Sequence, residues 1–154
     1  MRTLRVVTVG RPPRGPWGEL VADYAGRIRR RSPFRLESVP QDASRRPGDR
    51  RAREARALLA RRPDGAGVLV ALDRGGRALP SEEWPRALEA WRRRGDVTFL
   101  VGGPDGLDGS VLKNADVVLS LGPLLLPHDL ALLVLLEQLY RALAAAERHP
   151  YGRH

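Results

Sequence analysis

Glycines and leucines gather where two short apolar stretches of the sequence end. Val101 is followed by Gly102 and Gly103, and Leu121 opens the segment LGPLLLPH, which ends at His128. Paired glycines allow positive φ and let a flat ligand approach the backbone without meeting a Cβ. Backbone amides and carbonyls fixed by the glycine and the prolines could recognise the edge of a purine while the leucines hold its faces. The pattern therefore favours a ligand site for a flat, largely apolar group.

Both patterns have a purely structural alternative. The glycine pair is equally typical of a tight turn between a strand and a helix, and segment 121–127 could be a crossover packed onto the core. Loops are polar by default, so three successive leucines need a cover, and we expect a partner subunit or an apolar ligand to provide it. The glycine spacing is neither G-x-G-x-x-G nor that of a G-K-[ST] loop, which disfavours nicotinamide and nucleoside triphosphate sites.

The other polar residues do not form the usual metal-binding or hydrolytic sets. The chain has no cysteine, and its three histidines do not combine with carboxylates at metal-ligand spacing. No serine or threonine lies beside a base as a catalytic triad requires. We therefore expect no metal site. The lack of cysteine is also compatible with a reducing compartment, and we expect a cytoplasmic protein.

The balance of charge favours a polyanionic partner. The sequence has 27 basic and 18 acidic residues, a formal net charge of +9, and Lys113 is its only lysine. Such an arginine excess is typical of proteins that bind nucleic acid. The alternative is that arginine usage reflects genome composition or heat adaptation and that the charge is only a solvated surface. We favour nucleic acid.

Neither a signal peptide nor a membrane span is predicted. Residues 1–10 lead into a Pro/Arg loop rather than a small-residue cleavage site. Residues 117–136 are the most apolar stretch, but glycine, proline, histidine and aspartate occupy its middle. A spanning helix tolerates these residues least at that point, so we expect no membrane contact.

Apolar runs alternate with helical patterns along the whole chain. Strands are predicted at residues 4–9, 34–39, 67–72, 97–101 and 117–121, and helices at 17–31, 49–62, 81–94 and 129–148, with a short helix or turn at 110–114. This alternation, without a repeat or a long linker, predicts one α/β domain over residues 1–154 with a mostly parallel sheet. Ligands bind such sheets at the carboxyl ends of the strands, where the glycine and leucine segments lie.

The last predicted helix is apolar on nearly all sides in its first two turns. Its apolar residues include Leu130, Leu132, Leu133, Val134, Leu135, Leu136, Leu139, Tyr140 and Leu143. A helix that is apolar on several sides is buried on several sides. Complete burial within one subunit is harder for a terminal helix in a 17.0 kDa chain. We therefore predict a homodimer interface here.

Several motifs, taken together, match a known family over nearly the whole chain. They are LRVVTVG at 4–10, the Leu-Asp and glycine pattern at 72–76, FLVGGPDGL at 99–107, Pro127 with His128, EQLYRA at 137–142, and Pro150 with Tyr151 in the tail. With these motifs the chain resembles the RlmH family, SPOUT-class methyltransferases that modify N3 of a pseudouridine in large-subunit ribosomal RNA. The resemblance implies a SPOUT-type parallel sheet flanked by helices with a C-terminal trefoil knot, an obligate homodimer, and S-adenosyl-L-methionine as cofactor.

The resemblance also assigns residues to the two substrates. The cofactor would be bound by Leu72, Gly102, Leu121, Gly122, Pro123, Leu124, Leu125 and Leu126. The catalytic and RNA-facing residues would be His128, Arg141, Tyr151, Arg153 and His154. Since the sulfonium of the cofactor is already an activated electrophile, the protein mainly aligns the reactants. His128 or the tail would accept the proton of the target nitrogen, and Arg141 or Arg153 would stabilise the deprotonated base.

Three positions depart from the family pattern. Leu132 stands where an arginine is usual, Leu124 and Leu125 replace a Ser/Thr-containing loop, and the tail ends in YGRH, where His154 could take the place of the usual histidine. The leading hypothesis is an active methyltransferase that acts on large-subunit ribosomal RNA in the assembled ribosome. The alternative is a catalytically impaired ribosome- or RNA-binding protein that keeps the knotted fold, and a different target base is a third possibility.

Overall fold

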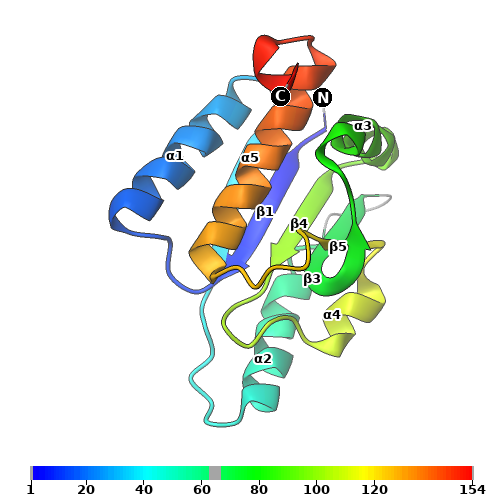
Figure 1. Ribbon diagram of the computed structural model, residues 1–154. Helices are drawn as coiled ribbons and strands as arrows, with labels where there is room; N and C mark the ends of the chain where they lie inside the picture. Colours follow the sequence, from blue (N-terminus) through cyan, green and yellow to red (C-terminus); the bar gives the residue numbers. More distant parts are fainter. Residues whose placement is uncertain (1, 63–66, 154) are drawn as a thin grey trace.

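Five parallel strands form one sheet in the order β2-β1-β4-β3-β5. The computed structural model describes residues 2–62 and 67–153. The strands are β1 (Leu4–Val9), β2 (Phe34–Val39), β3 (Val68–Ala78), β4 (Val97–Val101) and β5 (Val117–Ser120). All four strand pairs run parallel (Figure 1). The predicted α/β class and parallel sheet are confirmed.

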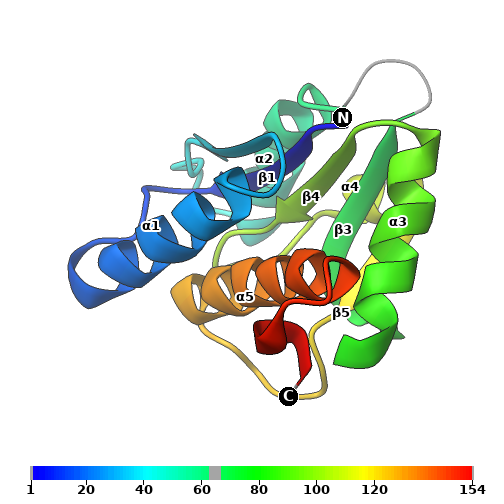
Figure 2. The ribbon, with the colours of Figure 1, turned by 90° about the horizontal axis from the view of Figure 1, so that it is seen from above.

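Helices cover both faces of this sheet. They are α1 (Gly15–Arg29), α2 (Pro47–Leu59), α3 (Trp84–Arg94), α4 (Gly109–Asn114) and α5 (His128–Ala146), with short 3-10 helices η1 (Ser81–Glu83) and η2 (Pro150–Arg153). Figure 2 shows α1, α5 and α3 on one face and α2 with α4 on the other. This arrangement makes three layers, with the sheet in the middle.

Alternate residues of the central strands feed two separate cores. Val6 and Phe99 pack with α1, α3 and α5, whereas Val7 and Leu100 pack with α2 and α4. All four side chains are fully buried. Because successive strand residues point to opposite faces, a strand covered on both sides must be apolar throughout. This explains the continuous apolar runs seen in the sequence.

Several element boundaries differ from the sequence prediction, and three of these differences have a clear physical reason. Helix α2 begins at Pro47, so Asp49 lies in its first turn and does not cap it; proline at the start of a helix costs no hydrogen bond. Ser81 opens a 3-10 turn, and α3 begins at Trp84. Strand β3 continues to Ala78 because its pairing with β5 resumes after a register shift between Leu72 and Arg77.

Helix α5 is buried mainly by its own chain. Six of its large side chains lie in the core shared with α1, α3 and the sheet: Leu132, Leu135, Leu136, Leu139, Tyr140 and Leu143. Leu130, Leu133 and Val134 are only half-buried. The apolar composition of α5 therefore does not by itself require a second subunit, and the dimer stays a prediction, as does the trefoil knot. In the described residues, no helix combines the length and apolarity needed to cross a membrane.

Candidate functional site

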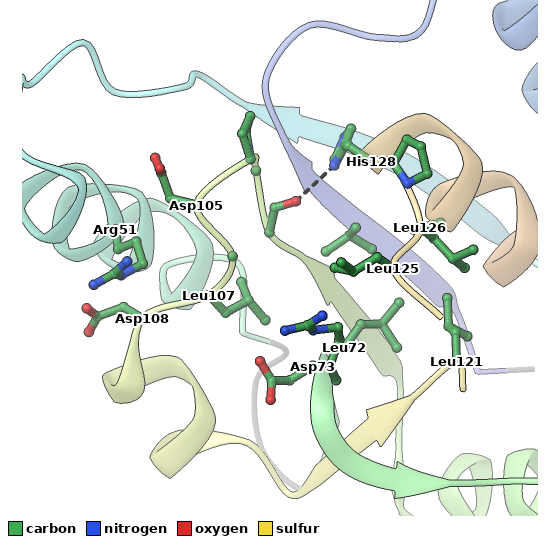
Figure 3. Close-up of a pocket in the computed structure, with 18 of the residues that line it drawn as sticks. Arg51, Leu72, Asp73, Asp105, Leu107, Asp108, Leu121, Leu125, Leu126 and His128 are labelled. Atoms are coloured by element: carbon green, nitrogen blue, oxygen red, sulfur yellow. Dashed lines mark hydrogen bonds between the residues drawn. The ribbon is translucent and has the colours of Figure 1, made fainter. Parts of the chain in front are cut away.

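A pocket of about 840 Å³ opens at the carboxyl edge of the sheet. It lies between the ends of β3, β4 and β5 and the start of α5 (Figure 3). Its lining includes seven of the eight predicted cofactor residues: Leu72, Gly102, Leu121, Gly122, Leu124, Leu125 and Leu126. Pro123, the eighth, is exposed and does not line it. His128 is also part of the wall.

The wall after β4 is a tight turn over residues 103–106. The backbone N–H of Gly106 donates to the carbonyl oxygen of Gly103 at 2.9 Å, with Pro104 in the second position. A Cβ on Gly102 would lie 2.7 Å from the carbonyl carbon of Gly106. The turn can therefore fold back only because Gly102 has no side chain. The glycine pair was interpreted either as a ligand site or as a tight turn. The structure shows a tight turn that requires Gly102, and this turn also lines the pocket.

The wall after β5 is the leucine segment. The side chains of Leu124 and Leu125 are 73% and 77% exposed. Leu121 packs against the core, but the middle of segment 121–127 is not a crossover packed onto it. Gly122 has φ +119°, a conformation that other residues rarely adopt. In the described part of the chain, the backbone N–H groups of Leu124, Leu125 and Leu126 donate no hydrogen bond to another protein group.

His128 joins this pocket from the first turn of α5. Its Nδ1 lies 2.9 Å from the carbonyl oxygen of Gly102, shown as the dashed line in Figure 3. A carbonyl oxygen only accepts hydrogen bonds, so Nδ1 must carry the hydrogen of this bond. In the neutral ring, Nε2 is then left with a free lone pair. The imidazole is half-buried, and its orientation is fixed by the end of β4.

Charged side chains lie along the opposite rim. Arg51 reaches the pocket from α2, Asp73 comes from β3, and Asp105 and Asp108 come from the segment after β4 (Figure 3). Asp108 caps α4 by accepting hydrogen bonds from the backbone N–H and the hydroxyl of Ser110 at 3.0 and 2.7 Å. These bonds lower the pKa of the Asp108 carboxyl below its ordinary value.

The sequence prediction missed these rim residues. Arg51 lies in the helix predicted at residues 49–62, and nothing local distinguishes it from its neighbouring arginines. The one available signal was the position of Asp73, Asp105 and Asp108 in the segments that follow predicted strands, where parallel sheets bind ligands.

Tyr151 and Arg141 form a second cluster at the other end of α5. The hydroxyl of Tyr151 donates to Oε1 of Glu137 at 3.0 Å and lies 2.7 Å from the hydroxyl of Tyr24. Arg141 donates to the same Glu137 oxygen from Nη2 at 2.6 Å and stacks 5.2 Å from the centre of the Tyr151 ring. The tail is thus docked onto α5 and α1.

These contacts control the protonation of the cluster. Partial burial, and then the hydrogen bonds with Tyr24 and Glu137, raise the pKa of the Tyr151 hydroxyl well above its ordinary value. The hydrogen bond with Glu137 raises the pKa of Arg141. At neutral pH Tyr151 therefore keeps its proton and donates a hydrogen bond to Glu137.

The predicted catalytic residues do not meet within one chain. Thirteen helical residues separate His128 from Arg141, which corresponds to about 20 Å along the axis of α5. Arg153 lies in η2 beside the tail cluster, and His154 lies outside the described residues. Leu132, which stands where the family usually has an arginine, is 1% exposed and packs in the core. It does not line the pocket. Among the described residues, no group of His, Asp or Glu side chains could hold a metal ion.

A parallel α/β sheet with an apolar pocket at its carboxyl edge and no metal cluster in the described residues is typical of a domain that binds an organic cofactor. The chain belongs to the SPOUT methyltransferase family: the family model described as "Predicted SPOUT methyltransferase" matches residues 1–152. The resemblance seen in the sequence is thereby confirmed.

Named relatives and solved structures agree with this assignment. The Ribosomal RNA large subunit methyltransferase H of Acidiphilium cryptum is 42% identical over 151 residues, covering 97% of this chain and 93% of that protein. The protein of the same name from Gluconacetobacter diazotrophicus is 47% identical over 152 residues, covering 97% of both. A probable methyltransferase from Bordetella pertussis shares the fold, with a TM-score of 0.55 at 18% identity, over 91% of this chain and 93% of that one.

Proposed function

We propose that this chain transfers a methyl group from S-adenosyl-L-methionine to large-subunit ribosomal RNA in the cytoplasm, at N3 of a pseudouridine in the assembled ribosome. One observation carries the proposal: seven of the eight residues predicted to bind the cofactor line a single pocket together with His128. The relatives named as ribosomal RNA methyltransferases, at 42% and 47% identity over 97% of the chain, supply the substrate class.

The residues of the pocket fit this cofactor. Leu72, Leu107 and Leu126 provide apolar surface for the flat adenine, and the unpaired N–H groups of the leucine segment provide donors for its edge. The volume of about 840 Å³ lies within the range of about 300–1,000 Å³ that small-molecule sites usually occupy. When bound, the cofactor supplies a methyl carbon on a positively charged sulfur, which keeps the electron pair when the carbon–sulfur bond breaks.

His128 is the proposed proton acceptor. N3 of the target carries a hydrogen and must lose it for its lone pair to form the new nitrogen–carbon bond. The Nδ1–H bond to the Gly102 carbonyl leaves Nε2 of a neutral ring able to take that proton. The same bond fixes the ring beside the glycine turn, so the proton acceptor and the cofactor wall share one anchor.

The other predicted catalytic residues would come from a second copy of the chain. Arg141 and Tyr151 lie about 20 Å along α5 from His128, too far to serve the same target within one chain. Trp17 and Leu20 of α1, together with Leu124 and Leu125 beside the pocket, expose apolar surface that a homodimer would cover. In such a dimer Arg141 and Arg153 would stabilise the deprotonated base, and Tyr151, whose hydroxyl donates its one hydrogen to Glu137, would position Arg141. His154, outside the described residues, would be the other candidate from the tail.

Label transfer to ribosomes tests this function. The protein is incubated with tritiated S-adenosyl-L-methionine and ribosomes from a strain that lacks the modification, and the labelled nucleotide is identified after digestion of the RNA. We expect label at N3 of one pseudouridine of the large subunit and none in ribosomes already modified. Cofactor binding in calorimetry without any label transfer would contradict the methyltransferase proposal and favour the RNA-binding alternative.

A further inference from the structure

A forked ion pair outside the predicted site joins α2 to the wall of the pocket. Nε of Arg50 donates to Oδ2 of Asp105 at 2.7 Å, and Nη2 donates to Oδ1 at 2.9 Å. Two parallel bonds fix the plane of the carboxylate as well as its position. Asp105 is the third residue of the turn 103–106, so this contact holds the turn directly. The side chains of Arg50 and Asp105 are only 22% and 18% exposed, which limits competition from water.

The same guanidinium also holds the loop that precedes α2. Nη1 of Arg50 donates to the carbonyl oxygens of Ser44 and Arg45 at 2.9 and 3.0 Å. The hydrogen bond between Arg50 and Asp105 raises the pKa of the arginine and lowers the pKa of the aspartate. Both groups therefore stay charged at neutral pH, and every nitrogen of the guanidinium is engaged.

A second residue of α2 supports the arrangement. Glu54 lies one helical turn after Arg50, on the same face of the helix. Its carboxylate is buried, and Oε2 accepts a hydrogen bond from the backbone N–H of Asp42 at 3.0 Å. A Cβ on Gly103 would lie 3.7 Å from Oε1 of Glu54. One face of α2 therefore contacts both the loop after β2 and the turn after β4.

The turn is thus anchored on two sides. Arg50 holds Asp105 from α2, and His128 donates to the carbonyl oxygen of Gly102 from α5. The backbone of Gly102 also packs closely against that of Gly106, so the two anchors act on one tightly packed unit. Losing the Arg50 anchor would leave a wall of the pocket held from the α5 side alone.

We propose that Arg50 is a positioning residue for the cofactor pocket, which holds the turn 103–106 in the form that binds S-adenosyl-L-methionine. This inference rests on the proposed function, since it concerns the same pocket. Arg50 itself does not line the pocket, and it acts through Asp105. Lysine cannot replace it fully, because an ammonium offers a point charge in place of the fork.

The test compares Arg50→Gln with wild type in cofactor binding, in steady-state kinetics and in amide hydrogen exchange. We expect the Kd and KM for S-adenosyl-L-methionine to rise about tenfold because one wall of the site is misplaced, while KM for ribosomes stays within about twofold. Arg50→Lys should give an intermediate loss. Asp105→Asn should match Arg50→Gln, and the double variant should be no worse than either, since both changes remove the same interaction. Amide hydrogen exchange of the turn should accelerate in the protein without cofactor.

Arg53→Gln is the matched control. Arg53 lies on the same helix, is 67% exposed and makes only a 3.9 Å contact with Asp42, so the same loss of charge should leave cofactor affinity unchanged. Arg50→Gln with wild-type cofactor affinity would overturn the inference, even if its melting temperature fell. If the wild type itself bound no cofactor, the proposed function would fail, and exchange of the turn would still decide the role of Arg50.

Discussion

The two ends of α5 are built in opposite ways. At its start, His128 joins a pocket whose leucine segment has exposed side chains and, within the described part of the chain, backbone N–H groups without protein partners. At its far end, Tyr24, Glu137, Arg141 and Tyr151 bind one another closely. An open apolar hollow is suited to receiving a ligand, whereas a saturated polar cluster is suited to holding its own groups in place. The difference indicates that the pocket receives a ligand, whereas the tail cluster holds its own side chains in a fixed orientation.

The largest effect is expected at His128. His128→Asn keeps an amide N–H that can donate to the Gly102 carbonyl, but it removes the proton acceptor. We expect the rate of label transfer to fall about 10²–10⁴-fold, the usual contribution of a general base, with cofactor affinity within about twofold of wild type. Single-turnover label transfer and calorimetry measure the two quantities. If the asparagine variant kept near-normal turnover, His128 would not be the proton acceptor.

Mixing two inactive variants sharpens the comparison between the ends of α5. Arg141→Gln should also be nearly inactive. If each site takes His128 from one copy and Arg141 from the other, an equal mixture of His128→Asn and Arg141→Gln should regain about a quarter of wild-type activity, since half of the dimers contain one intact site. No recovery after subunit exchange would show that both residues act within one chain.

A moderate effect is expected where the pocket wall turns back on itself. Gly102→Ala would place a Cβ 2.7 Å from the carbonyl carbon of Gly106, and backbone on both sides leaves no flexible neighbour to move. We expect the free energy of unfolding to drop by about 1–3 kcal/mol, the usual cost of overpacking, together with weaker cofactor binding. Gly48→Ala, where a Cβ meets nothing within 4 Å, is the control in denaturant titrations.

The smallest effect is expected in the tail cluster. Tyr151→Phe removes hydrogen bonds to Tyr24 and Glu137 and should cost about 0.5–1.5 kcal/mol of stability at neutral pH. The pKa of Tyr151 is raised in the folded chain, so its contribution is complete below the ordinary tyrosine value of about 10 and is lost as the pH rises above it. The stability gap between wild type and variant should therefore narrow above about pH 10 in urea titrations. A gap that widened there would contradict the raised pKa.

The sequence was most informative where a feature depends on neighbours along the chain. Apolar runs identified β1, β3, β4 and β5, because strands covered on both faces are largely apolar. Strand β2, with the sequence FRLESV at the edge of the sheet, was also predicted, although it has no such run. The segments 102–103 and 121–127 were identified as pocket candidates from neighbouring residues alone, because paired glycines and successive leucines are unusual after the end of a strand. Strand β3 was cut short at Leu72 because the register shift that lets it continue depends on β5, about 45 residues further on.

The sequence was least informative where distant segments meet. Nothing near Arg50 or Arg51 distinguishes them from the other arginines of α2, since their roles arise from Asp105 and the pocket, more than 50 residues away. The apolar composition of α5 was interpreted as a homodimer interface, but α1, α3 and the sheet of the same chain bury most of its apolar sides. These three contacts also come from distant segments. The resemblance assigned His128 and Arg141 to one site, but it could not place them at opposite ends of a helix.

Helix α5 acts as a molecular ruler between the two groups of residues. Each residue of an α-helix adds about 1.5 Å of length and about 100° of rotation. One residue inserted or deleted between His128 and Arg141 would turn the tail cluster to another side of the helix, together with the core side chains that follow the change. Length and phase of this segment are therefore under tighter constraint than the identity of most side chains along it.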